Sequence, residues 1–224
     1  MNRSELVDTG AIPGGGEMKL FRRGNDYTIR VAGRSGDLMS TRMHGSEDRL
    51  AELTCTKVAG RSRPRVLVGG LGIGFTLAAA LKQLGGNAEV VVAELVPKVV
   101  EWNREHLGAY AGHPLQDART VVRVEDVGAV MRSEPGGFDA ILLDVDNGPE
   151  GLTSRANDWL YSNEGLAVAK AALRARGLLA VWSAGPDYRF MARLEKTGMT
   201  VEEKKVRAHG NKGARHIIWL AEKT

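Results

Sequence analysis

Strand-like and helix-like hydrophobic patterns alternate along most of the chain. Short apolar runs predict buried strands at 66–68, 88–93, 120–124, 138–143 and 178–182. Segments with helical spacing lie between them, at about 75–84, 97–107, 127–132 and 163–174. Because strands that alternate with helices build parallel sheets with crossover connections, the pattern predicts a doubly wound α/β fold.

The end of the chain departs from this alternation. Residues 199–206 and 214–221 both read as strands, and the turn-rich, basic segment 209–213 separates them. Two strands joined by such a segment predict an antiparallel hairpin. Five parallel strands followed by this pair give a mostly parallel, seven-stranded sheet, which is typical of the Rossmann-like fold of class I methyltransferases.

The first part of the chain predicts a small appendage. Residues 27–31 alternate as a strand does, and 37–43 can pair with them across the turn at 33–36. Ser46, with Glu47 and Asp48 after it, predicts the cap of a helix that ends near residue 60. The glycine-rich run at 10–16 predicts a flexible lead-in. We therefore expect a short β-hairpin and helix appendage at 1–60 and one main domain at 61–224.

Composition narrows the class of protein. The chain has 224 residues, enough for one α/β core and an appendage, and its 43% hydrophobic and 26% charged residues exclude disorder and a membrane protein. The net charge of +4 is spread along the chain, so a nucleic-acid partner is not indicated. Cys55 is the only cysteine, which excludes an internal disulfide and a cysteine-based metal site. With no signal peptide or membrane span in the pattern, we expect a cytoplasmic protein.

The strand at 66–68 runs directly into a glycine loop that contains Gly69, Gly70, Gly72 and Gly74. Glycine is needed where the backbone turns tightly and where a ligand must approach without meeting a Cβ atom. A tight strand-to-helix turn without a ligand would need the same residues. The position of the loop, after the first strand of the main domain, favours a nucleotide-type ligand.

Glu94 ends the second strand of the main domain. A carboxylate at that position can accept hydrogen bonds from both ribose hydroxyls of an adenosine. Capping of the helix that begins near Pro97 is the alternative role, and the two are compatible. The glycine loop and Glu94 together predict a nucleoside site, so the domain at 61–224 is expected to bind a nucleoside.

Two further acids follow strands at the same edge of the predicted sheet. Asp126 can accept a hydrogen bond from an adenine amino group while the amide of Val127 donates to a ring nitrogen. Capping of the next helix explains Asp126 equally well. Asp144 follows the strand 138–143 and would face the reacting part of a bound nucleoside, where it can orient or deprotonate an amine. A turn-forming and capping role is its alternative.

These four positions together resemble the spermidine synthase family of polyamine aminopropyltransferases. The resemblance covers about residues 66–221 and rests on VGGLG at 68–72, AELVP at 93–97, VEDV at 124–127 and FDAILLD at 138–144. It implies that Glu94 holds the ribose, Asp126 the adenine and Asp144 the attacking amine, with decarboxylated S-adenosylmethionine as the donor.

The resemblance also extends to the acceptor side. GPEGL at 148–152 is similar to the family's loop over the active site. Asp146 before this loop, and Trp159 and Tyr161 after it, are therefore expected to contact a small-molecule amine acceptor. The family resemblance further implies a homodimer or homotetramer. We expect no metal, because nothing at metal-ligand spacing accompanies the histidines His44 and His216.

Three functions remain open on the sequence alone. We favour aminopropyl transfer, because acids such as Asp144 and Asp146 would repel the carboxylate of intact S-adenosylmethionine. A methyltransferase that uses intact S-adenosylmethionine and an unknown small-molecule acceptor needs the same nucleoside site. The third is a nucleoside-binding or scaffold protein without catalysis, because the appendage is shorter than the family's N-terminal β-domain.

Overall fold

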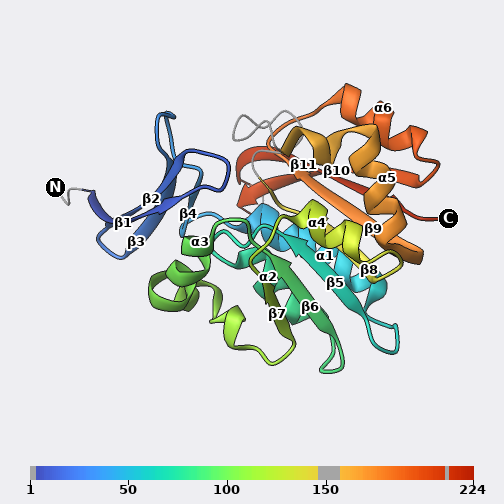
Figure 1. Ribbon diagram of the computed structural model, residues 1–224, viewed down its shortest axis with the longest axis horizontal. Helices are drawn as coiled ribbons and strands as arrows, with labels where there is room; N and C mark the ends of the chain where they lie inside the picture. Colours follow the sequence, from blue (N-terminus) through green and yellow to red (C-terminus); the bar gives the residue numbers. More distant parts are fainter. Residues whose placement is uncertain (1–3, 146–156, 210–211) are drawn as a thin grey trace.

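The computed structural model describes residues 4–145, 157–209 and 212–224 and is built around a seven-stranded sheet (Figure 1). The order of the strands in this sheet is β10-β11-β9-β8-β5-β6-β7. Strands β9, β8, β5, β6 and β7 pair in parallel, and β11 pairs antiparallel with both β9 and β10. The predicted fold class is confirmed. The strands are β5 (Arg65–Gly69), β6 (Glu89–Ala93), β7 (Thr120–Arg123), β8 (Phe138–Leu143), β9 (Leu173–Ser183), β10 (Thr200–His209) and β11 (Lys212–Glu222).

Burial explains why the inner strands were readable as apolar runs. All six residues of β8 are buried, and in β5 only Arg65 is not. A strand that is covered on both faces carries apolar side chains on both, so it shows no alternation. In the centre of the sheet Leu67 lies opposite Val91 on one side and Ile141 on the other.

Helices cover both faces of the sheet. Buried side chains of α1 (Gly45–Val58), α2 (Phe75–Gln83) and α3 (Pro97–Trp102) pack on one face. Those of α4 (Val127–Ser133), α5 (Asn163–Ala172) and α6 (Tyr188–Lys196) pack on the other. Helix α3 continues through a π-helical turn at Asn103–Leu107. Short 3-10 turns follow at Gly108–Ala111, Pro114–Gln116 and Asn157–Tyr161. Helix α6 has no counterpart in the sequence prediction.

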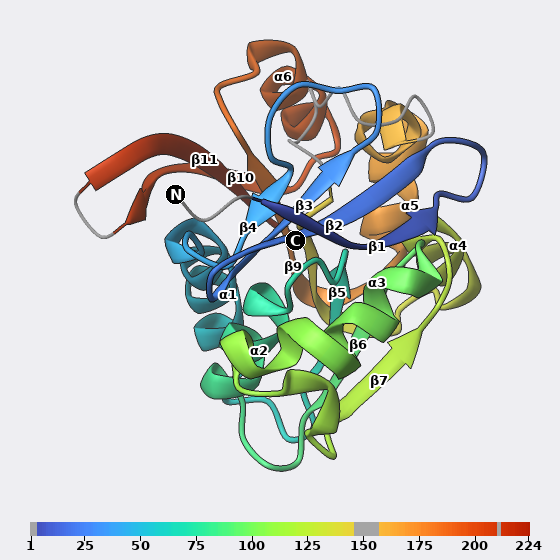
Figure 2. The ribbon, with the colours of Figure 1, turned by 90° about the vertical axis from the view of Figure 1, so that its left-hand side faces the viewer.

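The N-terminal region forms a second, antiparallel sheet of four strands. Its strands are β1 (Glu5–Ala11), β2 (Glu17–Arg23), β3 (Asp26–Val31) and β4 (Met39–Ser40). The predicted pairing across residues 33–36 is confirmed, since Thr28 lies opposite Ser40 and Ile29 opposite Met39. This sheet lies beside the edge of the large sheet at which the parallel strands end, on the left in Figure 1 and in front in Figure 2.

Two predictions about this region were wrong. The glycine run at 10–16 is not a frayed lead-in: it ends β1 and turns the chain into β2, with Gly14, Gly15 and Gly16 at φ 89, 120 and 97°. Ser46 does not cap α1, which begins at Gly45 after His44, and the Ser46 hydroxyl instead donates to the Glu47 carboxylate at 2.7 Å.

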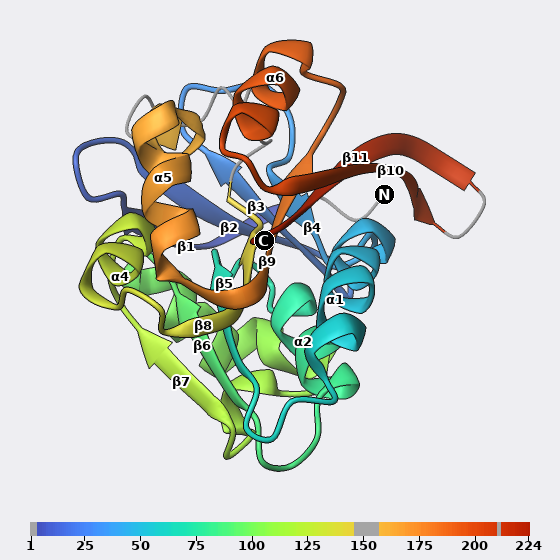
Figure 3. The same ribbon diagram turned by 90° about the vertical axis from the view of Figure 1, so that its right-hand side faces the viewer.

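Helix α1 joins the two sheets. It follows β4 in sequence, and it packs against α2 and against strands β8, β9 and β10 of the large sheet (Figure 3). The domain boundary at residue 60 stays a prediction. Over the described ranges, no helix has the length and apolar character that crossing a bilayer requires.

Candidate functional site

The glycine loop lies at the carboxyl end of β5 and forms one wall of a cavity of about 110 Å³. Gly70 and Gly72 line this cavity with positive φ angles of 88 and 52°. A Cβ atom on Gly70 would lie 2.5 Å from the carbonyl oxygen of Asp144, and one on Gly72 would lie 2.8 Å from the sulfur of Met39. The loop therefore needs glycine both for its conformation and for close contact with its neighbours.

The other two predicted glycines border the cavity without lining it. Gly69 is the last residue of β5, and the space beside its Cα is filled by Val127 and Leu143. Gly74 precedes the first residue of α2. These two glycines set the path of the strand and helix that hold the loop.

Glu94 is buried directly beside the loop. Its Oε2 accepts a hydrogen bond from the backbone N–H of Leu71 at 2.9 Å, and its Oε1 accepts one from Val96 at 2.8 Å. Burial raises the pKa of Glu94, while hydrogen bonds from backbone amides oppose that rise. Glu94 thus lines the cavity and fixes the loop at once.

Asp126 and Val127 line the cavity at the start of α4. The Oδ1 atom of Asp126 accepts a hydrogen bond from the Ala129 N–H at 2.9 Å, so the capping role is present. Arg132 lies 3.6 Å from the same oxygen. Both roles considered for Asp126 are geometrically compatible, because the capping residue also reaches the cavity.

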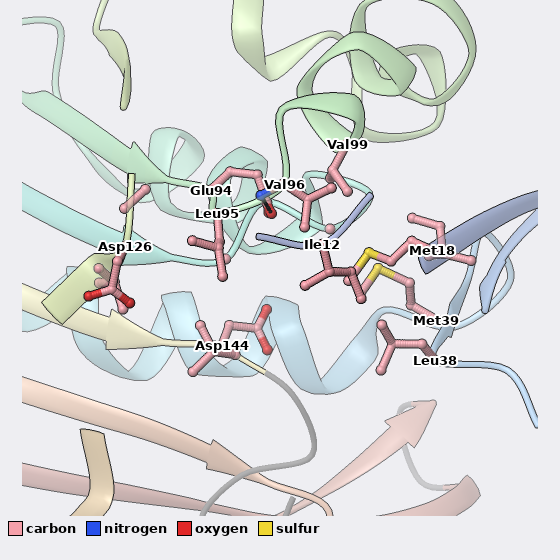
Figure 4. Close-up of a pocket in the computed structure, with 16 residues that line it drawn as sticks. Ile12, Met18, Leu38, Met39, Glu94, Leu95, Val96, Val99, Asp126 and Asp144 are labelled. Atoms are coloured by element: carbon pink, nitrogen blue, oxygen red, sulfur yellow. Dashed lines mark hydrogen bonds between the residues drawn. The ribbon is translucent and has the colours of Figure 1, made fainter. Parts of the chain in front are cut away.

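Asp144 follows β8 and faces the same cavity (Figure 4). The hydroxyl of Thr76 donates to its Oδ2 at 2.5 Å. Burial, followed by the negative charge of Glu47, raises the pKa of Asp144 to about 7, and the Thr76 hydrogen bond partly opposes this. A carboxyl group that is half ionised near neutral pH is suited to accept and return a proton.

The N-terminal sheet supplies the opposite wall, which consists of apolar side chains. Figure 4 shows four of them facing the three acids across the cavity, and the set is Ile12, Met18, Ile29, Leu38 and Met39. The sequence pattern does not predict this wall, because residues 10–16 read as a flexible lead-in. The apolar side chains within residues 10–31 are the sequence feature that could have indicated a buried wall.

The predicted acceptor contacts lie elsewhere or beyond the described residues. The ring of Trp159 packs on Arg132 of α4, with the guanidinium carbon 4.4 Å from the ring centroid. Tyr161 is buried, and its hydroxyl donates to the carbonyl of Val145 at 3.1 Å, next to Asp144. Asp146 and the loop at 148–152 lie outside the described residues. The acceptor role of all three residues stays a prediction.

Two residues beside Asp144 are not marked by the sequence pattern, which gives no role to Thr76 and predicts Glu47 only as part of a helix cap. Both line a second cavity together with Asp144. Both residues are far from Asp144 along the chain, and only the fold brings α1 and α2 to the end of β8. Their contact with Asp144 could therefore not be predicted from the sequence. Within the described ranges, no three His, Cys, Asp or Glu residues are grouped so as to hold a metal ion.

Comparison with known proteins gives matches in structure only. No family model and no curated protein matches the sequence. A spermidine synthase from Thermotoga maritima matches with a TM-score of 0.77 at 17% identity, over 98% of this chain and 73% of that one. A spermidine synthase in complex with the transition-state analogue AdoDATO matches at 0.76 and 16% identity, over 98% and 72%.

A third match is a probable spermidine synthase from Corynebacterium glutamicum, with a TM-score of 0.67 at 14% identity, over 100% of this chain and 81% of that one. All three matches cover the N-terminal sheet as well as the large sheet, since almost the whole chain is aligned. This chain therefore has the fold of the spermidine synthases.

Proposed function

We propose that the protein is a spermidine synthase-like transferase that moves an aminopropyl group from decarboxylated S-adenosylmethionine to an amine acceptor. One observation carries the proposal: Glu94, Asp126 and Asp144, which follow β6, β7 and β8 at one edge of the large sheet, line one cavity beside the glycine loop. One structural match is a complex with a transition-state analogue, which supports the presence of a ligand site in this fold. At identities of 14–17% these matches support the fold and leave the reaction to be tested.

In the proposed complex Glu94 accepts hydrogen bonds from the ribose hydroxyls. Asp126 accepts one from the adenine amino group, and the Val127 amide donates to a ring nitrogen. The apolar wall of the N-terminal sheet covers the other side of the nucleoside and keeps water from it. Such a site is already formed before the ligand arrives, because Glu94 holds the loop through the amides of Leu71 and Val96.

The proposed reaction is a displacement at carbon. The acceptor binds as an ammonium ion and gives one proton to Asp144. The freed nitrogen lone pair attacks the methylene carbon next to the sulfonium, a C–N bond forms and the C–S bond breaks. The bonding electrons go to sulfur, so the neutral thioether 5′-methylthioadenosine leaves. Orientation and proton removal supply the catalysis.

The charge of the site favours the decarboxylated donor. Asp144 and Glu47 are acidic, and among the described residues lining the two cavities there is no Lys or Arg. A carboxylate on the donor would therefore meet like charges without a countercharge. The decarboxylated donor keeps its ammonium group and lacks the carboxylate, so it brings no negative charge toward these acids.

Calorimetric titration of decarboxylated and intact S-adenosylmethionine into the purified protein tests this proposal. We expect the decarboxylated form to bind at least about tenfold more tightly, a difference of about 1.4 kcal/mol. Tighter binding of intact S-adenosylmethionine would favour the methyltransferase alternative and contradict the proposal. Turnover is then measured with Asp144→Asn, which we expect to lose about 10²- to 10⁴-fold in kcat.

A nucleoside-binding protein without catalysis predicts a different result. In that case Glu94→Ala abolishes nucleoside binding, while Asp144→Asn leaves every measurable turnover unchanged. We further propose a cytoplasmic homodimer or homotetramer. Light scattering of the eluting protein during gel filtration checks the assembly, and a monomer at micromolar concentration would contradict it.

A further inference from the structure

The glycine loop depends on neighbouring elements for a fixed conformation. Gly70, Gly72 and Gly74 have positive φ angles of 88, 52 and 94°. Glycine loses more conformational freedom on folding than any other residue, so a loop that contains three glycines needs bonds from outside to hold one shape. A ligand that binds to this loop binds more tightly when those bonds exist before it arrives.

Gly72, which lines the nucleoside cavity, is held on both sides. On its N–H side, burial raises the pKa of Glu94, and hydrogen bonds from backbone amides, that of Gly72 among them, oppose this rise. On its C=O side, the Nδ2 atom of Asn103 donates to the carbonyl oxygen at 2.7 Å. Because a trans peptide group points its C=O and N–H in opposite directions, the Asn103 bond orients the whole peptide group between Gly72 and Ile73.

The side chain of Asn103 is committed to this contact. It is 2% exposed, and its Nδ2 atom also donates to the carbonyl oxygen of Val99, another residue of the cavity wall, at 2.9 Å. Both partners are carbonyl oxygens, so the amide must turn its NH₂ group toward them. The Oδ1 atom is consequently buried without a hydrogen-bond partner among the described residues. Because an unpartnered buried oxygen costs stability, the fold holds the Gly72 carbonyl at the expense of the amide oxygen.

Two glycines leave room for Asn103 between the helix and the loop. Asn103 is the first residue of the π-helical turn, and its carbonyl oxygen accepts a hydrogen bond from the N–H of Gly108, five residues later. A Cβ atom on Gly108 would lie 2.5 Å from that oxygen, and one on Gly74 would lie 3.1 Å from Oδ1. Turns of this kind inside α-helices are frequent at functional sites. The π-helical turn therefore fixes the position from which Asn103 reaches the loop.

We propose, on the basis of the function proposed above, that Asn103 is a positioning residue for the donor. It fixes the Gly72 peptide group, so the glycine loop meets the nucleoside part of the donor in a conformation that is already formed. Asn103 does not line the nucleoside cavity, and its effect on the ligand passes through Gly72.

Calorimetry with 5′-methylthioadenosine tests the proposal. Asn103→Ala removes the group that donates to Gly72, and we expect it to bind the nucleoside about tenfold less tightly than the wild type. In turnover, KM for the donor should rise by a similar factor while kcat changes less, because Asp144 keeps its surroundings. Unchanged nucleoside affinity in Asn103→Ala, or a loss that appears in kcat alone, would overturn the proposal.

Thr54→Val is the matched control for the loss of a buried hydrogen bond. Thr54 is fully buried in α1, and its hydroxyl donates at 2.7 Å to the carbonyl oxygen four residues earlier, as Asn103 does to that of Val99. It lines neither the nucleoside cavity nor the second cavity. Thr54→Val should bind 5′-methylthioadenosine as the wild type does, and a loss equal to that of Asn103→Ala would contradict the proposal.

Gly108→Ala displaces Asn103 without a change in the loop itself. The added methyl group would meet the Asn103 carbonyl oxygen, so the π-helical turn must shift and weaken the bond to Gly72. We expect a loss of nucleoside affinity close to that of Asn103→Ala, and no further loss in the double variant, because both changes act through one bond. Gly86→Ala is the control, since a Cβ atom there meets nothing within 4 Å. Additive losses in the double variant would contradict the proposal.

The carbonyl carbon-13 resonance of Gly72 reports on the bond in the free protein. Loss of a hydrogen bond to a carbonyl oxygen moves this resonance upfield. We expect the shift in Asn103→Ala and in Gly108→Ala, and a resonance at the wild-type position in Thr54→Val. A wild-type position in Asn103→Ala would show that Asn103 does not fix this peptide group, and would overturn the proposal.

Failure of this inference and failure of the proposed function give different results. If the wild type does not bind 5′-methylthioadenosine, the proposed function is contradicted and the role in donor binding is lost with it, while the Gly72 resonance still decides whether Asn103 fixes the loop. If the wild type and Asn103→Ala bind the nucleoside equally well, only the role of Asn103 is wrong.

Discussion

At the scale of single residues, the environment of Asp144 disfavours its ionised form, and the resulting pKa near 7 suits it to proton transfer. Its carboxyl group is partly buried, lies near the acid Glu47 and receives one hydrogen bond, from Thr76. The first two influences favour the protonated form, and the third favours the ionised form. Because the pKa of Asp144 in the folded protein is about 7, the free energy of unfolding depends on pH.

Asp144→Asn should stabilise the protein at high pH. The folded-state pKa of about 7 lies above the ordinary value of 3.8, so the native state holds a proton that the unfolded chain has lost between these two pH values. The free energy of unfolding of the wild type therefore falls as pH rises from 4 to 7. We expect the variant to be more stable by about 2 kcal/mol at pH 8, with no difference below pH 4.

Urea unfolding of both proteins at pH 4, 6 and 8 checks this expectation. A gain in stability that is the same at all three values would show that packing, and not ionisation, is responsible. A variant that is less stable at pH 8 would contradict the raised pKa.

Thr76→Val should raise the pKa of Asp144 further. The substitution keeps the shape of the side chain and removes the hydroxyl that donates to Oδ2. Carbon-13 NMR titration of the Asp144 carboxyl, identified by its absence in Asp144→Asn, measures the change. Thr76→Ser keeps the hydroxyl and should titrate as the wild type does, and a lower pKa in the valine variant would contradict the role assigned to Thr76.

The residues that sequence could identify are those whose neighbours are local. Glu94 and Asp144 follow apolar strands, and the edge of a parallel sheet is where ligands bind, so their position was predictable. Glu47 and Thr76 lie in helices and do not follow an apolar strand. Their importance comes from their shared contact with a carboxylate that lies far along the chain, which only the tertiary structure supplies.

At the scale of elements, the N-terminal sheet completes the nucleoside cavity and is held by a small number of polar contacts. Asp8 of β1 accepts a hydrogen bond from the indole N–H of Trp102 at 2.9 Å and lies 3.3 Å from the ammonium of Lys98. These bonds lower the pKa of Asp8, the Trp102 bond most strongly. Tyr27 of β3 stacks against His106, with ring centroids 6.0 Å apart.

Asp8→Ala should weaken nucleoside binding more than it weakens the fold. Loss of the Trp102 bond removes about 1 kcal/mol of docking energy, so 5′-methylthioadenosine should bind about fivefold less tightly. Hydrogen exchange should rise in residues 5–31 and stay constant in the large sheet. Asp26→Ala is the control, because Asp26 pairs only with the exposed Arg42 among the described residues.

The success of prediction also differed among elements. Strands β5, β6 and β8 are buried on both faces, so their apolar runs were unambiguous. Strand β1 has only one buried residue, and α6 buries only Phe190 and Leu194, so both patterns read as polar. The position of an element with only one or two buried residues depends on its contacts with other elements. Such contacts cannot be predicted from the sequence of the element alone.

At the scale of the whole molecule, an ionic cluster lies at the edge of the large sheet opposite to the candidate site. Asp139, at the start of β8, is 2% exposed and accepts hydrogen bonds from Arg61 at 2.5 Å, from Arg174 at 2.7 Å and from the backbone N–H of Arg65 at 2.7 Å. It ties the segment after α1 to β5 and β9. The same strand carries Asp144 at its other end.

Asp139→Ala should destabilise the whole protein without altering the site. Removal of the carboxylate leaves two guanidinium groups and one buried amide without their partner, which costs about 3 kcal/mol. Chemical denaturation measures this loss, and affinity for 5′-methylthioadenosine should stay within twofold of the wild type. Asp37→Ala, which breaks an exposed pair with Arg30, should cost less than about 1 kcal/mol.

Asp144 lines both the nucleoside cavity and the second cavity, and this position affects when its carboxyl group can accept a proton. A sulfonium placed beside Asp144 would add a positive charge and pull its pKa below neutrality, so the proton acceptor becomes active when the donor arrives. In the proposed reaction, cleavage of the C–S bond turns the sulfonium into a neutral thioether, so the pKa of Asp144 would rise again and the carboxyl would keep the proton that it took from the amine. Asp144 would thus be most fully ionised while the donor is bound and has not yet reacted.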